Sequence, residues 1–306
     1  MVSFNLPVIP SLLQTLFMLF AGLSLFLAGI AGAQSSESRQ LAGSITPLRA
    51  AVGQFQLKPN IDANLKAIES MLEIAAHNDA ELIVFPECAL TGYPPPGRDS
   101  LDFINQDSTE KVLKYLRQRA RDLSMAIALG AGWQDQQAIW RNRAFFIDDT
   151  GEILAYYDKI QQTDHERKFF RDGERLPTFS WRNLRLGMLI CMDMRYPELW
   201  RIMRQSGVNL MLHLASAYGN SEWKVPVLEG TMRCRAAENG FYIVSCNNAG
   251  PVQMMVSGIY NPDGLMLARA NYAVEEVIFS DMVIGAPEGF VDFKSDIYLL
   301  QKKSKE

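Results

Sequence analysis

Residues Leu184–Arg201 read LRLGMLICMDMRYPELWR and contain an apolar run, a polar turn and the start of a helix, in that order. The run Leu186–Ile190 has the length and composition of a buried strand. Pro197 favours the first turn of a helix, because its fixed φ suits that position and its missing N–H is not needed there. A strand that leads directly into a helix predicts an α/β fold, and the turn between them carries Cys191.

The remainder of the chain alternates apolar runs of strand character with helical patterns, without an internal repeat. Because strands outnumber helices, this pattern favours two sheets covered by helices. Asn60 or Asp62 is expected to begin a helix with one apolar face, formed by Leu65, Ile68, Leu72 and Ala75. Further helices are predicted at Thr109–Leu123 and Val225–Asn239. Strands are predicted at Arg49–Gln56, Leu82–Phe85, Met125–Trp133, Ala144–Ile147, Ile153–Tyr157, Leu186–Ile190, Leu210–Leu214, Tyr242–Ser245 and Val277–Met282.

Composition narrows the class of protein. The chain has 306 residues, of which 48% are hydrophobic and 21% charged, a balance typical of globular proteins. Its net charge is −4 and no run of like charges interrupts the mixture, so nucleic acid is not expected as a partner. Its four cysteines form no CxxC pair and no Cys/His cluster at zinc spacing, which argues against a disulfide-dense scaffold and a zinc site.

An uncharged apolar segment runs from Leu12 to Ala33 near the start of the chain. It is long enough to span a bilayer as a helix, while the small residues Ala31–Ala33 suit signal peptidase. A cleaved signal peptide and a permanent membrane anchor therefore both stay open, and either predicts a membrane-anchored or exported protein. We expect this signal or anchor at 1–33, a linker at 34–46, one α/β domain at 47–285 and a tail at 286–306.

Three side chains at strand ends have the chemistry of a hydrolytic site. Glu87 in LIVFPECALTGY follows a buried strand, where burial raises a carboxyl pKa as a general base requires. Lys159 in EILAYYDKI ends another strand and offers a positive charge for an oxyanion. At the turn that carries Cys191, the partial positive charge of the helix start favours a thiolate, and the backbone N–H groups can receive an oxyanion. Taken singly, each also fits a simpler interpretation as a loop carboxylate, a surface lysine or a buried thiol.

The histidines do not indicate a Cys/His site. His77 is predicted at a helix end, His165 in a charged loop, and His213 within an apolar strand as a core residue. The remaining cysteines are interpreted as structural, with any disulfide pairing left open; they are Cys88, Cys234 and Cys246.

Taken together and in this order, Glu87, Lys159 and Cys191 resemble the Glu-Lys-Cys triad of the nitrilase superfamily, the carbon–nitrogen hydrolases. The resemblance extends from about Arg49 to Met282 and includes the stretches RAAENGFYIVSCNNAG and SGIYNPDG. It implies a four-layer α-β-β-α sandwich, here preceded by one N-terminal hydrophobic helix. It also implies an enzyme without a metal or organic cofactor, and a homo-oligomer of at least two copies.

The same resemblance assigns roles to further residues. Glu166 in ERKFFRDGE matches a second glutamate that supports the site, whereas its neighbour Glu174 does not. The backbone N–H of Met192 is expected to help hold the oxyanion, and Tyr93 and Trp223 are expected to line the substrate pocket.

Two departures from the family pattern bear on the substrate. Gln161 and Gln162 stand where relatives often have His-Leu, so the local substrate contacts are expected to differ. After Cys191 the chain has Met-Asp instead of the Trp-Glu of true nitrilases, which indicates the amidase and carbamoylase branches.

The resemblance therefore predicts hydrolysis of an amide or N-carbamoyl bond of a small molecule, with release of ammonia through a cysteine thioester. The alternative is a non-catalytic or acyl-transferring subunit, held in a membrane complex by the N-terminal helix. The presence of all three triad residues argues against this alternative, because a scaffold has no evident need for them.

Overall fold

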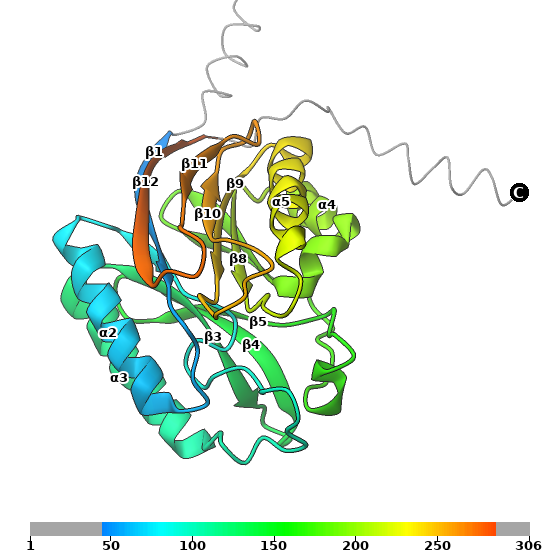
Figure 1. Ribbon diagram of the computed structural model, residues 1–306. Coiled ribbons are helices and arrows are strands. Elements are labelled where there is room, and N and C mark those ends of the chain that lie inside the picture. Colours follow the sequence, from blue (N-terminus) through cyan, green and yellow to red (C-terminus); the bar gives the residue numbers. More distant parts are fainter. Residues whose placement is uncertain (1–44, 286–306) are drawn as a thin grey trace, which may run out of the picture. The chain divides into compact units, whose positions relative to one another are not determined.

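The computed structural model describes residues 45–285, which fold into two stacked six-stranded sheets with helices on the outer side of each (Figure 1). Helices α2 (Ile61–His77) and α3 (Gln106–Leu123) cover the first sheet, and α4 (Pro197–Gln205) and α5 (Val225–Asn239) cover the second. For these residues the predicted α/β fold, with two sheets covered by helices, is confirmed.

Each sheet is parallel at its centre and antiparallel toward its edges. The first sheet has the order β12 (Glu276–Ile284), β1 (Thr46–Gln54), β2 (Leu82–Val84), β3 (Ala126–Gln134), β4 (Trp140–Ile147) and β5 (Ile153–Asp158). The second has the order β11 (Met266–Arg269), β10 (Gly258–Tyr260), β9 (Tyr242–Asn247), β8 (Leu210–Ala215), β7 (Leu184–Ile190) and β6 (Thr178–Trp181).

Alternation along the strands places apolar side chains on both faces of each sheet. In β2, Leu82 and Val84 join the cluster between the two sheets, whereas Ile83 joins the cluster under α2 and α3. The layer between the sheets includes Phe146 from β4 and Met188 from β7, both fully buried. Because both faces of the central strands are covered, these strands are apolar throughout, as is usual for parallel strands.

Local sequence signals explain where the helices begin and end. Asn60 is the residue that caps α2, since its side chain accepts a hydrogen bond from the backbone N–H of Ala63 at 2.9 Å. Pro197 begins α4 as expected, and α5 ends at Gly240, whose φ of 62° suits a residue without a Cβ.

Strand β6 was not expected from the sequence. It is only four residues long, too short for its alternation to stand out, although Phe179 and Trp181 are buried as a strand pattern requires. The strand predicted at Arg49–Gln56 instead spans Thr46–Gln54, where it pairs along its whole length with β12.

The predicted localisation needs correction. Among residues 45–285, no helix combines the length and the apolar character needed to cross a membrane. This finding contradicts the prediction of a membrane-anchored or exported protein. The segment 12–33, on which that prediction and the predicted N-terminal helix rested, lies outside the described residues.

Candidate active site

Glu87 follows β2 and reaches the edge of the first sheet because the neighbouring strand leaves room for its backbone. A Cβ added to Gly130 in β3 would lie 2.4 Å from the backbone nitrogen of Cys88 and 2.9 Å from Cα of Glu87. Only glycine allows so close an approach between the strand and the turn. The fully buried Glu87 carboxylate therefore sits in a backbone position that Gly130 makes possible.

Hydrogen bonds from both sheets hold the Glu87 carboxylate. Its Oε1 accepts from Nζ of Lys159 at 2.6 Å and from Nδ2 of Asn142 at 2.7 Å, both residues of the first sheet or its connecting loop. Its Oε2 accepts the backbone N–H of Ser216 at 2.8 Å, and Ser216 directly follows β8 of the second sheet. The carboxylate thus bridges the two sheets.

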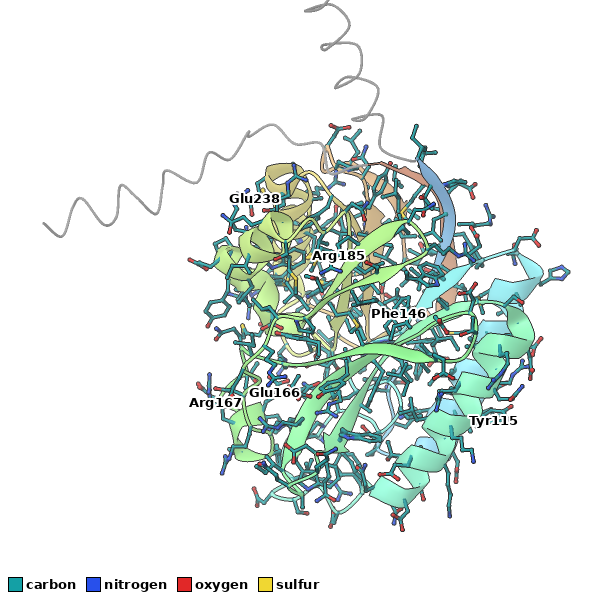
Figure 2. All side chains as sticks on the ribbon, turned by 180° about the vertical axis from the view of Figure 1, so that it is seen from behind. Tyr115, Phe146, Glu166, Arg167, Arg185 and Glu238 are labelled. Atoms are coloured by element: carbon teal, nitrogen blue, oxygen red, sulfur yellow. The ribbon has the colours of Figure 1, made fainter. Side chains whose placement is uncertain are left out.

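Lys159 follows β5 and is fully buried between two carboxylates. Its Nζ donates to Oε1 of Glu87 and to Oε1 of Glu166, each at 2.6 Å. Glu166 begins the short helix η1 (Glu166–Lys168), and its other oxygen accepts the backbone N–H of Thr163 at 2.6 Å. Its side chain lies inside while that of its neighbour Arg167 is turned to solvent (Figure 2). The structure therefore brings three predicted residues into one buried cluster.

Cys191 lies at a tight turn where β7 passes into the short helix η2 (Cys191–Arg195). Its φ of 43° falls in the left-handed region, a strained conformation for a residue with a side chain. The carboxylate of Asp193 stabilises the turn by accepting the backbone N–H of Ile190 at 2.9 Å. The carbonyl of Cys191 lies 3.2 Å from Nε2 of His213 in the neighbouring strand. The nucleophile candidate is thus held by the backbone and by buried side chains.

Burial and the three charges set the protonation of the cluster. Burial raises the pKa of Glu87 to about 8, with the charge of Lys159 opposing this rise and that of Glu166 adding to it. Burial opposes ionisation of Glu166 as well, but Lys159 and the hydrogen bonds bring its pKa to about 2. Burial alone would lower the pKa of Lys159, yet the two facing carboxylates hold it well above its ordinary value.

The thiol of Cys191 is kept protonated by the same surroundings. Burial raises its pKa, and the carboxylate of Glu87 raises it further, whereas Lys159 and the backbone N–H of Ser216 act in the opposite direction. A thiol in this state needs a nearby base before it can act as a nucleophile. Glu87, with its pKa near neutrality, has the properties of that base.

Two members of the cluster were missed by sequence reasoning. Asn142 in β4 donates to Glu87 and, at 3.0 Å, to Oε1 of Glu166, so it contacts both carboxylates. Its only sequence signal is its place two residues before the apolar run Ala144–Ile147. Ser216 contributes its backbone N–H, a group that every residue except proline carries, so its side chain gave no signal.

The two predicted pocket residues occupy different environments. Tyr93 packs edge-on against Tyr218, with ring centroids 6.0 Å apart, and its pKa is raised by burial and by the carboxylates of Glu166 and Glu87. Trp223 lies on the short helix η3 (Glu222–Lys224), where the residue is 68% exposed and its ring lies against the ammonium of Lys224. The structure therefore brings Tyr93 to the cluster but not Trp223.

The remaining predicted residues lie as follows. His213 is a buried histidine, whose Nδ1 lies 2.9 Å from the Ser245 hydroxyl, as expected of a core residue. Glu174 is exposed and lies outside the cluster. All four cysteines are free: Cys88 and Cys246 are buried, Cys191 is partly exposed and Cys234 is exposed. Within residues 45–285, no group of three or more His, Cys, Asp or Glu side chains is arranged to hold a metal ion.

Comparisons with known proteins agree with this geometry. Residues 49–286 match the family described as carbon-nitrogen hydrolase. An (R)-stereoselective amidase from a Pseudomonas species is 29% identical over 216 residues, 71% of this chain and 71% of that one. A nitrilase from Pyrococcus abyssi is 26% identical over 261 residues, 82% of this chain and 92% of that one.

The fold has a counterpart among solved structures. A structure of an amidase from Nesterenkonia sp. AN1 superposes with a TM-score of 0.72 at 24% sequence identity, over 83% of this chain and 96% of that one. This likeness supports the same arrangement of sheets and helices. Since the family match spans most of the chain, the protein belongs to the carbon–nitrogen hydrolases of the nitrilase superfamily, on the amidase-like branch.

Proposed function

We propose that this enzyme hydrolyses the C–N bond of a small-molecule amide or N-carbamoyl compound, with Cys191 as nucleophile and a thioester as intermediate. The observation that carries the proposal is the buried cluster of Glu87, Lys159 and Glu166, which is joined to the second sheet beside the Cys191 turn. The Nesterenkonia amidase supports it, because a variant of that enzyme carries the acetamide moiety of fluoroacetamide as a covalent addition at its active-site cysteine.

The first step forms the thioester. Glu87 accepts the S–H proton of Cys191, and the thiolate attacks the carbonyl carbon of the amide to give a tetrahedral oxyanion. Ammonia then leaves with the proton that Glu87 took up, and the acyl group remains on sulfur. A base with a pKa of about 8 is suited to both directions of this transfer, because it gains and loses a proton near neutral pH.

The oxyanion needs hydrogen-bond donors at the moment that it forms. An ammonium group has three N–H bonds, and Lys159 uses two of them on Glu87 and Glu166. The third is the donor that we assign to the oxyanion, together with the backbone N–H of Met192 in the turn after Cys191. Glu166, which the resemblance assigns to a supporting role, holds Lys159 in place for this purpose.

The second step releases the acid. Glu87, ionised again once ammonia has left, removes a proton from a water molecule, which attacks the thioester carbonyl. Collapse of the second tetrahedral species expels the thiolate of Cys191, which recovers its proton from Glu87. The products are a carboxylic acid, or a carbamic acid from an N-carbamoyl substrate, and ammonia.

We assign Tyr93 to a wall of the substrate pocket. For Trp223, which is exposed on η3, the same role rests on the resemblance alone. The contact of Tyr93 with Tyr218 and its electrostatic coupling to Glu87 support this role for Tyr93. A pocket wall acts on substrate binding, so Tyr93→Ala is expected to raise KM more than it lowers kcat. The same measurement on Trp223→Ala separates a pocket role from that of an exposed surface residue.

The test of the proposed function is ammonia release by the full-length protein. The panel contains primary amides, N-carbamoyl amines, N-carbamoyl amino acids and nitriles, with Cys191→Ala as control. Release from an amide or carbamoyl compound that disappears in Cys191→Ala is the expected result. Release from nitriles alone, or none from folded protein, would contradict the proposal.

We also propose that the enzyme assembles as a homodimer through the outer side of α4 and α5. Ile202 on α4 is 38% exposed and Val227 on α5 is 54% exposed, so this helical face offers apolar side chains that a second copy could cover. Light scattering on the full-length protein measures the assembly, with Val227→Asp expected to shift it toward the monomer. A monomer in the unaltered protein would contradict this proposal.

A further inference from the structure

Two donors of the buried cluster bond to the same pair of oxygens. Nζ of Lys159 donates to Oε1 of Glu87 and to Oε1 of Glu166, and Nδ2 of Asn142 donates to these same two atoms at 2.7 and 3.0 Å. A carboxylate oxygen has two lone pairs. Oε1 of Glu87 is therefore fully occupied, and it cannot receive a further proton without losing one of these bonds.

The other oxygen of Glu87 is differently placed. Its Oε2 accepts one hydrogen bond, from the backbone N–H of Ser216 at 2.8 Å, which leaves one lone pair open. The parallel pairing of β7 with β8 sets Ile190 beside Leu214, so the turn at Cys191 lies next to the end of β8 that carries Ser216. Oε2 is therefore the oxygen directed toward the strand ends that carry the thiol.

Asn142 is itself held in a single orientation. Its Oδ1 accepts a hydrogen bond from Sγ of Cys88 at 3.7 Å, which leaves its Nδ2 directed at the carboxylates. Its backbone carbonyl accepts the N–H of Lys159 at 2.9 Å, so Asn142 and Lys159 are also joined through the main chain. The side chain is buried, and its two N–H bonds are both used within the cluster.

We propose that Asn142 is a positioning residue which, with Lys159, occupies Oε1 of Glu87 so that the proton of the Cys191 thiol passes to Oε2. In that step the S–H bond breaks, an O–H bond forms at Oε2, and the sulfur is left as thiolate. This role rests on the proposed function, because it assumes that Glu87 is the base of Cys191.

The test uses the rate at which iodoacetamide alkylates Cys191, which does not depend on knowing the substrate. The rate is followed at the Cys191 peptide by mass spectrometry, because Cys234 is exposed and also reacts. Asn142→Leu removes both N–H donors of Nδ2 and keeps a side chain of similar size. Asn142→Asp replaces the amide nitrogen with an oxygen that can only accept. Cys88→Ser is the matched control, since it keeps a donor to Oδ1 of Asn142 and leaves the amide in place.

Loss of the Asn142 donors makes the ionised form of Glu87 harder to reach. The midpoint of the pH dependence of alkylation is expected to rise by about one pH unit in Asn142→Leu, the effect of one charge-assisted hydrogen bond, and further in Asn142→Asp. It is expected to stay in place in Cys88→Ser. With an active substrate in hand, Asn142→Leu should lower kcat about 10-fold or more while KM changes little.

An unchanged midpoint in the folded Asn142 variants would overturn the proposal, as would an equal shift in Cys88→Ser. Loss of the folded state in both Asn142 variants would also overturn it, because the residue would then be structural. These outcomes are distinct from failure of the proposed function. If the proposed function fails, the unaltered protein hydrolyses no amide. The pH dependence of Cys191 alkylation is then the same in the unaltered protein and in Glu87→Gln.

Discussion

The hydroxyl of Tyr157 donates a hydrogen bond of 2.8 Å to the carboxylate of Asp193. Tyr157 lies in β5 just before Lys159, and Asp193 lies in the turn just after Cys191, so the bond joins the segments that carry the two groups. The other oxygen of Asp193 accepts the backbone N–H of Gln161 at 3.0 Å. A buried contact outside the reacting groups therefore joins the segment that carries the lysine to the segment that carries the thiol.

Removal of this contact should destabilise the protein. Tyr157→Phe deletes the donor to Asp193 and the acceptor of the Ile160 N–H, and it leaves a buried carboxylate with one partner fewer. We expect a loss of about 1–3 kcal/mol in the free energy of unfolding, measured by urea denaturation. Tyr156→Phe is the control, because Tyr156 is 51% exposed. An equal loss in both variants would show that the Asp193 contact is unimportant.

Replacement of the buried lysine should affect catalysis and stability together. Lys159→Met removes an oxyanion donor, so turnover should fall by about 10²–10³-fold or more. It also leaves Glu87 and Glu166 facing each other without their cation, which should cost about 3–5 kcal/mol. Amide hydrolysis and urea unfolding measure the two effects. Lys168→Met, at an exposed position of η1, should change neither, and activity retained in Lys159→Met would contradict the assigned role.

The activity should depend on pH through Glu87. Burial raises its pKa to about 8, and a general base must be ionised to accept a proton. The value of kcat/KM is therefore expected to rise with pH below about 8 and to level off above it. A pH profile on one amide substrate measures this limb. A flat profile between pH 6 and 8 would be incompatible with Glu87 as the titrating base.

The position of Glu87 in the site should depend on the absence of a side chain at Gly130. Gly130→Ala places a Cβ 2.4 Å from the backbone nitrogen of Cys88, so the turn with Glu87 must move. We expect loss of most activity together with a lower melting temperature. Gly230→Ala is the matched control, since a Cβ there meets no atom within 4 Å and alanine favours the helix α5. Full activity in Gly130→Ala would contradict this account of the turn.

The buried histidine should make the fold sensitive to acid. Burial lowers the pKa of His213 from 6.5 to about 4, so between these values the unfolded chain binds a proton that the native state does not. Stability is therefore lost as pH falls from about 6.5 through 4, by up to about 3 kcal/mol. His213→Gln should flatten this part of the stability profile, measured by urea unfolding at several pH values. An equal dependence of the free energy of unfolding on pH in His213→Gln and in the unaltered protein would refute this role of His213.

The site residues that could be predicted from the sequence are those whose position follows from the pattern of apolar residues just before them. Glu87 and Cys191 each end a short apolar run, and a run of that kind identifies a buried strand and its end. The arrangement of two sheets could be expected from the count of strands and the family resemblance. These signals lie within a few residues of the side chain they locate.

The missed features depend on how distant segments meet. Asn142 enters the cluster because β4 pairs with β5 in a register that sets Arg143 opposite Asp158, and no local pattern encodes that register. Ser216 acts through its backbone, and Gly130 through an absent side chain, so neither has a recognisable residue type. Trp223 was assigned from the resemblance alone, and its exposure depends on the packing of η3.

The hydrogen bond from Ser216 to Glu87 has a consequence for the growing polypeptide. The carboxylate belongs to the first sheet and its partner N–H to the second, so the base and the thiol cannot meet before both sheets have stacked. The first sheet is completed only when β12, from the last described residues, pairs with β1. A ribosome-bound fragment that ends before β12 contains both Glu87 and Cys191, but its first sheet lacks the strand that completes it. We expect such a nascent chain to be catalytically silent until the fold is finished.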